Sequence, residues 1–147
     1  MKTPYSLTFP IRWADVDPNR HVRHTAYGDY ATHVRVSFMT ERGFPVEKWV
    51  ELGIGPVVLT EQIDYLKEVA LGEKICIDLT LAGISKSRKR FRLRHQIYKE
   101  DGSLAVRIHM MFGWIDLHQR KMITPDAAHP VTQVFQQLET TEDFGEF

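Results

Sequence analysis

The sequence predicts an α+β fold in which one long helix lies against a curved antiparallel sheet. Apolar residues recur with helical spacing between residues 27 and 41, and strands with alternating polarity follow between residues 57 and 116. Short turns separate those strands, and parallel strands would need crossovers of about a dozen residues or more, so an antiparallel meander is indicated. A helix with one apolar face and a curved sheet can each bury the apolar surface of the other.

The first strand is expected over residues 5–13, where apolar and polar residues alternate. Pro10 has no N–H group to donate, so an edge position in the sheet is favoured for this strand. The residues expected on its buried face are Tyr5, Leu7, Phe9, Ile11 and Trp13.

The long helix is expected to begin near Tyr27 and to end before Gly43, a residue type that readily adopts the left-handed conformation found after helices. A second, short helix is expected over residues 46–52, ended by Gly53. The apolar residues that share one face of the long helix are Tyr27, Tyr30, Ala31, Val34 and Phe38.

Four further strands are expected from the alternation of apolar residues, over residues 57–65, 75–81, 91–97 and 104–114. The pair Asp101-Gly102 is typical of a hairpin turn, and Gly83 indicates a bulge. Glu61 interrupts the apolar face of the first of these strands, and a structural role is favoured for it. A last helix is expected from Pro130 onward.

The length of 147 residues fits one domain over residues 1–147, with residues 139–147 expected as a flexible acidic tail. The chain has 19 basic and 19 acidic residues, and this balance argues against nucleic acid or a membrane surface as a partner. The lack of an apolar leader and of an apolar run of about 20 residues favours a cytoplasmic protein. Cys76, the single cysteine, is expected as a buried thiol because it lies in an apolar strand.

A short polar segment, residues 15–26, directly precedes the long helix. Backbone N–H groups at a helix N-terminus can bind an anion or a polarised carbonyl oxygen. A carboxylate beside such amides indicates acyl-transfer chemistry. The groups in this segment that can take part in acid–base chemistry or hydrogen bonding are Asp15, Asp17, Asn19, His21 and His24.

The run Trp13-Ala14-Asp15-Val16-Asp17-Pro18, followed by His21-Val22 and by Tyr27 in a helix, resembles the opening motif of hotdog-fold thioesterases. It is similar in particular to the acyl-CoA thioesterases related to 4-hydroxybenzoyl-CoA thioesterase. The resemblance implies the hotdog fold, a long central helix wrapped by a curved antiparallel sheet, over nearly the whole chain. It also implies hydrolysis of an acyl-CoA thioester to a free acid and coenzyme A.

Matched residue by residue, the resemblance assigns the catalytic carboxylate to Asp17, acting as general base or as nucleophile, and a second catalytic role to His24. Asn19, Thr25 and Tyr27 are the expected substrate-binding residues. The basic segment expected to contact the phosphates of coenzyme A comprises Ser87, Arg88, Lys89 and Arg90. No cofactor is expected beyond the coenzyme A of the substrate.

Each assignment has a structural alternative. Asp-Pro pairs also begin turns, so Asp17 alone is weak evidence of catalysis. A basic run is also typical of a solvated strand end. Asp15 is expected to be structural and to accept backbone N–H groups, because it points away from Asp17 in an extended loop. His21, His24 and His33 have a spacing that some metal sites share, but no metal site is expected because no cysteine cluster accompanies them.

Two other functions stay open. Ala26 and the missing glycine at Asn19-Arg20 depart from the family motif, which would suit a non-catalytic module that binds acyl thioesters. The segment Asn19-Arg20-His21-Val22 is also similar to the N-x-H-V of thioesterases that act on acyl carrier protein. A homodimer, and beyond it a tetramer, is expected because pairing of two sheets would remove an exposed edge.

Overall fold

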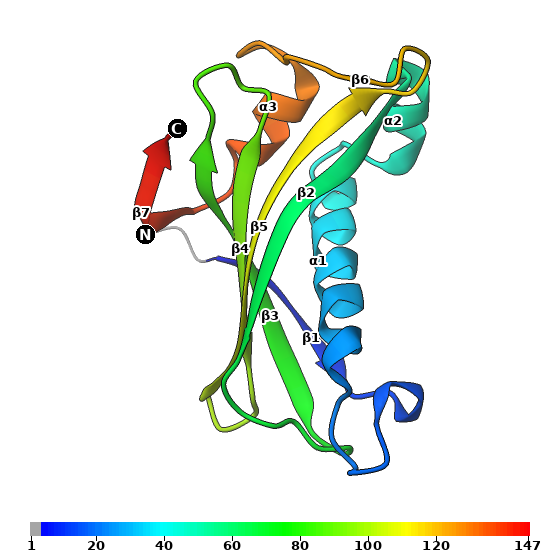
Figure 1. The fold of residues 1–147 in the computed structure, drawn as a ribbon, viewed down its shortest axis with the longest axis vertical. Helices are drawn as coiled ribbons and strands as arrows, with labels where there is room; N and C mark the ends of the chain where they lie inside the picture. Colours follow the sequence, from blue (N-terminus) through cyan, green and yellow to red (C-terminus); the bar gives the residue numbers. More distant parts are fainter. Residues whose placement is uncertain (1–3) are drawn as a thin grey trace.

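The computed structural model describes residues 4–147, and within this range seven strands form one curled sheet (Figure 1). Two 3₁₀ helices, Trp13–Asp15 and His24–Ala26, precede the long helix. The helices are α1 (Tyr27–Glu41), α2 (Val46–Leu52) and α3 (Pro130–Phe135). The strands are β1 (Tyr5–Pro10), β2 (Ile54–Tyr65), β3 (Lys74–Ile84), β4 (Phe91–Tyr98), β5 (Leu104–Asp116), β6 (Lys121–Met122) and β7 (Thr140–Glu146).

The centre of the sheet is the antiparallel meander β3–β4–β5, as the short turns predicted. On one side, β1 pairs with the first part of β3, while β7 pairs in parallel with its last part. On the other side, β2 pairs with β5 along almost its whole length, and β6 adds a short pairing to the end of β5. Within the described residues, β2 therefore has one edge without a strand partner.

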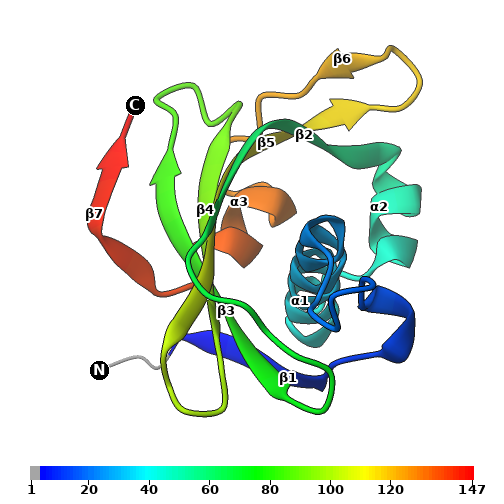
Figure 2. The same cartoon turned by 60° about the horizontal axis from the view of Figure 1, so that its bottom comes forward.

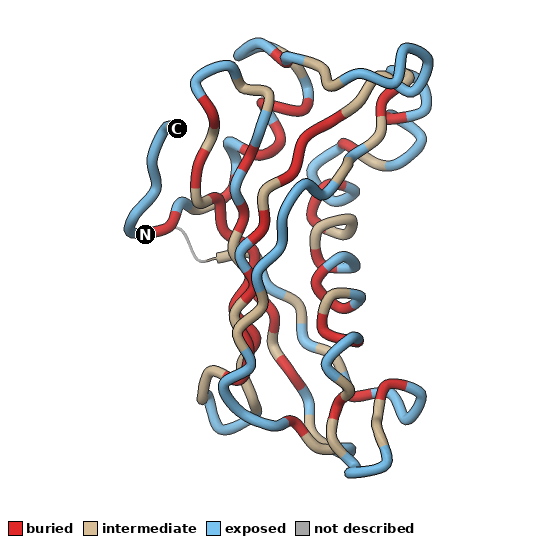
Figure 3. Tube along the Cα trace, viewed as in Figure 1, coloured by how far each residue is buried: buried red, intermediate tan, exposed pale blue. Residues whose placement is uncertain are grey.

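Helix α1 lies in the concave side of the sheet, where Figure 2 shows it nearly end-on and enclosed by β1, β3, β4 and β5. The predicted apolar face is buried: Ala31, Val34 and Phe38 have no exposed surface. Helix α3 lies on the same side, and its Phe135 packs 6.5 Å from the ring of Phe38. Figure 3 shows the buried residues along the sheet-facing side of α1 and along the central strands. The predicted α+β class and the wrapped long helix are confirmed.

The first strand is shorter than predicted. It ends at Pro10, and Trp13 is 80% exposed instead of lying on the buried face. The reason is a local turn: the Asp15 N–H donates to the Arg12 carbonyl at 3.0 Å, and the two side chains form an ion pair. This turn takes the chain out of the sheet before Trp13 can continue the alternation.

The expectation of a flexible tail over residues 139–147 was wrong, because this segment forms β7. The pairing of β1 with β3 stops at Leu79, which leaves backbone groups of β3 near Gly83 without partners. Strand β7 pairs with this part of β3, and the Arg92 guanidinium lies 3.8 Å from the ring centre of Phe147.

Two smaller features of the strands also differ from a regular pattern of buried and exposed residues. Cys76 is only partly buried, because it lies on the opposite face of β3 from the buried Ile75 and Ile77. A register shift between Val58 and Thr60 marks the irregularity in β2 at Leu59. Among residues 4–147, no helix combines the length and the apolar character that crossing a bilayer requires.

Candidate active site

The loop that carries Asp17 is a small hairpin before α1. Val16 and Val22 form an antiparallel bridge, and the Arg20 N–H donates to the Asp17 carbonyl at 2.9 Å. Arg20 has a φ of 67°, the left-handed conformation that favours glycine. An arginine therefore makes the turn at the place where the family motif carries a glycine. The hairpin is held to the segment after β2, because the Val22 N–H donates to the Val69 carbonyl at 2.8 Å.

The Asp17 carboxylate is held by its own turn. Its Oδ1 accepts the backbone N–H of Asn19 at 2.9 Å and that of His21 at 3.3 Å. In the part of the chain that the structure describes, no hydrogen bond engages its Oδ2. One oxygen thus orients the carboxyl group, and the other is available to a water molecule or a substrate.

A cavity of about 360 Å³ lies beside this carboxylate. One wall comes from the hairpin and the start of α1, and the other comes from the end of β2 and the residues that follow it. The cavity brings together four predicted site residues, Asp17, Asn19, His24 and Tyr27. Its other lining residues are His21, Val22, Tyr65, Leu66, Lys67 and Glu68.

Tyr65, the last residue of β2, is a lining residue that the sequence analysis missed. Its hydroxyl donates to the His24 carbonyl at 3.2 Å, and its ring centre lies 6.0 Å from that of Tyr27. It ties the end of β2 to the start of α1 across the cavity. Burial, the largest cause, raises the pKa of Tyr27 to about 12, so its hydroxyl stays protonated at neutral pH.

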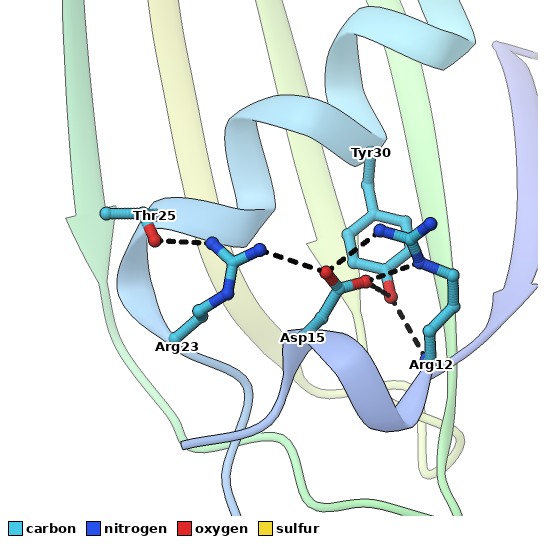
Figure 4. Close-up of polar contacts among 5 residues, drawn as sticks. All are labelled: Arg12, Asp15, Arg23, Thr25 and Tyr30. Carbon is cyan, nitrogen blue, oxygen red and sulfur yellow. Dashed lines mark hydrogen bonds and ion pairs between the residues drawn. The ribbon is translucent and has the colours of Figure 1, made fainter.

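Thr25, the fifth predicted residue, is engaged elsewhere. Its Oγ1 accepts a hydrogen bond from Nη1 of Arg23 at 2.6 Å, and it does not line the cavity (Figure 4). No side chain caps α1 at Ala26. The first backbone N–H groups of a helix have no intrahelical acceptor, so this end of α1 can donate to a bound oxygen.

Asp15 is the buried centre of a polar network, drawn in Figure 4. Its carboxylate is 1% exposed and accepts from Nε of Arg12 at 2.7 Å, from the Tyr30 hydroxyl at 2.6 Å and from Nη2 of Arg23 at 3.2 Å. The hydrogen bond from Arg12 is the largest cause of the lowered pKa of Asp15. Its structural role agrees with the sequence analysis, but the groups that donate to it are side chains rather than backbone N–H groups. The network joins the hairpin to α1.

The basic segment Ser87–Arg90 lies at the opposite end of the sheet from Asp17. It belongs to the turn between β3 and β4, whereas the Asp17 hairpin lies near the start of β3, because His21 forms a bridge with Ala70 just before that strand. The 11 residues of β3 separate the two ends by about 35 Å. Arg88 has a φ of 58° in this turn, and the Arg90 N–H donates to Ser85 Oγ at 3.0 Å. A single chain therefore does not bring the basic segment to the Asp17 cavity.

Among residues 4–147, no group of three or more His, Cys, Asp or Glu side chains has an arrangement that could hold a metal ion. The chemistry that the cavity itself offers is that of a carboxylate, an imidazole and the N-terminal end of a helix.

Known proteins resemble this chain in sequence and in fold. A family profile described as the thioesterase-like superfamily matches residues 11–138. A protein of Aquifex aeolicus (strain VF5), provisionally named an esterase, is 26% identical over 102 residues, which cover 69% of this chain and 78% of that protein.

Two solved structures from Staphylococcus aureus resemble the whole chain. A hypothetical protein in complex with CoA has a TM-score of 0.83 at 22% identity, covering 96% of this chain and 89% of that one. A DHNA-CoA thioesterase has a TM-score of 0.80 at 20% identity, covering 90% and 88%. The fold is therefore the hotdog fold, as predicted. Because the profile spans most of the sequence, the chain belongs to the thioesterase-like superfamily, and the predicted class of enzyme, a thioester hydrolase, is confirmed.

Proposed function

We propose that the protein hydrolyses an acyl-CoA thioester to a free acid and coenzyme A in the cavity beside Asp17. The observation that carries this proposal is the Asp17 carboxylate, oriented by two backbone N–H groups at one oxygen and unengaged at the other, in a cavity at the start of α1. A neighbour solved in complex with CoA and a neighbour named as a CoA thioesterase support the choice of thioester.

In this proposal, the thioester carbonyl lies at the N-terminal end of α1, where backbone N–H groups stabilise the negative charge that develops on its oxygen. Asp17 either removes a proton from the attacking water or attacks the carbonyl carbon itself and forms an anhydride that water then cleaves. In both routes the C–S bond breaks and one water molecule is consumed: its oxygen adds to the acyl carbon, in the second route by attack on the acyl side of the anhydride, and one of its protons ends on the sulfur of the leaving coenzyme A. His24, exposed at the cavity, donates to the carbonyl oxygen, and Asn19 and Tyr27 position the acyl group.

We also propose that two copies pair through β2. Among the described residues, this twelve-residue strand is the longest one with an unpaired edge, and edges of this length are usually covered. Large apolar residues are exposed along it and directly after it: Val58, Leu59, Tyr65 and Leu66. In a twofold dimer with antiparallel pairing of β2, the end of the sheet that carries Ser87–Arg90 in one copy lies at the Asp17 end of the other. The basic segment could then bind the phosphates of coenzyme A across the interface.

A panel of acyl-CoA and acyl-carrier-protein thioesters, followed with a thiol reagent, tests this function. We expect thiol release with CoA thioesters, and we expect Asp17→Asn to lower kcat/KM by two or more orders of magnitude. Asp29→Asn is the matched control, because Asp29 is an exposed carboxylate in the first turn of α1 that does not line the Asp17 cavity.

Parent-like activity of Asp17→Asn would exclude the catalytic role of this residue. Tight binding of the thioesters without thiol release would indicate a non-catalytic binding module instead. Release from carrier-protein thioesters alone would move the substrate from coenzyme A to acyl carrier protein.

A further inference from the structure

A polar pair, Arg35 and His95, lies on the concave side of the sheet. His95 of β4 has no exposed surface, and Arg35 of α1 is partly exposed. Nδ1 of His95 lies 2.7 Å from the Asp78 carbonyl oxygen, and Nε2 lies 3.0 Å from Nη1 of Arg35. A guanidinium group can only donate, so Nε2 accepts and Nδ1 carries the proton that is donated to Asp78. The imidazole is therefore neutral, in one tautomer.

The positive charge of Arg35 has no ion-pair partner within residues 4–147, since none of the salt bridges there includes it. Burial lowers the pKa of Arg35 to about 10, and the charge of Glu61 on β2 opposes this shift. Burial, and after it the charge of Arg35, lowers the pKa of His95 to about 3. At neutral pH the pair is thus a guanidinium cation against a neutral imidazole.

Arg35 contacts His95 of β4, and it also lies within the electrostatic influence of Glu61 on β2. Nη2 donates to Thr32 Oγ1 at 2.8 Å, and its remaining N–H groups have no recorded acceptor in the described chain. On the same helix, a Cβ atom added to Gly28 would meet no atom within 4 Å, which shows open space beside the helix.

Arg35 and Glu61 lie beyond the Asp17 cavity, farther along the two elements that form its walls. Tyr27 lines the cavity, and Arg35 follows it by eight residues, which is about 12 Å along the helix. On β2, Tyr65 lines the same cavity, and Glu61 precedes it by four residues, which is about 13 Å along the strand. Register places Glu61 opposite Met110 of β5, whose side chain is on the buried concave face. Arg35 on α1 and Glu61 on β2 therefore lie at about the same distance from the Asp17 cavity.

We infer that Arg35, held in place by His95, is a specificity-determining residue that selects acyl groups with a hydrogen-bond acceptor at the end remote from the thioester. This inference rests on the proposed function, because it takes the thioester to lie beside Asp17. A hydroxyl or a carboxylate at that depth accepts from the free N–H groups of Arg35. A plain hydrocarbon end would displace water from the guanidinium and offer no acceptor, and sites built for hydrogen bonding discriminate strongly against such analogues.

The test compares three CoA thioesters of equal chain length: octanoyl-CoA, 8-hydroxyoctanoyl-CoA and the CoA thioester of suberic acid. We expect the parent to prefer at least one polar-ended substrate over octanoyl-CoA by roughly 10-fold or more in kcat/KM. Arg35→Met keeps the length of the side chain and removes its donors. We expect it to lower kcat/KM for the polar-ended substrates by roughly 10- to 100-fold and to leave octanoyl-CoA unchanged or improved. The two polar arms show whether the acceptor is a hydroxyl or a carboxylate.

An equal loss on all three substrates in Arg35→Met, or a parent that prefers octanoyl-CoA, would overturn the inference and leave Arg35 a structural role only. A parent that prefers octanoyl-CoA refutes the inference even if Arg35→Met does not fold, and Arg35→Lys, which keeps one donor group, then tests the role of the side chain. The affinities of the three thioesters for the Asp17→Asn protein give the same ratio without hydrolysis. Failure of the whole acyl-CoA panel would refute the proposed function, while this affinity ratio separately supports or refutes the role of Arg35.

Discussion

Asp78 offers a test of how the fold holds a buried carboxyl group; its backbone carbonyl accepts from His95, and its side chain contacts Gln96. It lies on β3, 8% exposed, and its Oδ1 accepts the Gln96 N–H at 2.6 Å. Burial, the largest cause, raises the pKa of Asp78 from 3.8 to about 6, and the hydrogen bond from Gln96 only partly opposes this shift. We expect the unfolding free energy of Asp78→Asn, relative to that of the parent, to be higher at neutral pH than at acid pH.

The sign follows from the direction of the shift. The folded pKa of Asp78 lies above the unfolded value, so the stability that its carboxyl group contributes is complete below about pH 3.8 and is lost as the pH rises through about 6. The rise of this pKa from 3.8 to about 6 corresponds to about 3 kcal/mol of unfolding free energy. Of this, about 2 kcal/mol is lost between pH 4 and pH 7.5. Asparagine does not titrate, so the variant escapes this loss.

Urea unfolding of the parent and of Asp78→Asn between pH 4 and pH 7.5 measures the effect. The hydrogen bonds of the new amide do not depend on pH, so they add a constant to the difference in unfolding free energy between variant and parent. The way this difference varies with pH therefore reports the titration of Asp78. We expect the unfolding free energy of the variant minus that of the parent to rise by about 2 kcal/mol over this range. A difference that stays constant, or that falls, would refute the account of Asp78 as a carboxyl group with a raised pKa.

Two further predictions concern the hairpin before α1. Arg20→Gly should raise the unfolding free energy by about 0.5–1 kcal/mol in urea titrations, because Arg20 adopts a φ of 67° that glycine tolerates without strain. Asn19 is not in the left-handed region, so Asn19→Gly should give no such gain. An equal gain from Asn19→Gly would contradict this reasoning. Asp15→Asn should cost about 1.5–3 kcal/mol at pH 7, because it removes the buried charge that accepts hydrogen bonds from the partly exposed Arg12 and Arg23. The lowered pKa of Asp15 means that this stabilisation is present above about pH 3.8 and is lost as the pH falls further, so a penalty that persists unchanged at low pH would argue against it.

Local patterns in the chain were sufficient for the elements and for part of the candidate site. The apolar positions between Tyr27 and Phe38 form one buried face of α1, because helix periodicity depends only on residues a few positions apart. Gly43 and Gly53 both adopt positive φ after their helices, as their positions indicated. Asp17, Asn19, His24 and Tyr27 lie within eleven residues of one another, so a single hairpin and a helix start could bring them to one cavity.

Features that depend on the pairing of distant segments could not be predicted from such local patterns. Tyr65 closes the cavity from 41 residues beyond His24, and His95 contacts Arg35 across 60 residues. The last residues form β7 because β1 leaves part of the β3 edge unpaired, which no property of the tail itself reveals. Short-range periodicity sets which face of an element is apolar, but register and curvature of the sheet set which faces meet. That is why the carboxylate and the long helix were evident from the residues, whereas the far wall of the cavity and the Arg35–His95 pair came only from the folded chain.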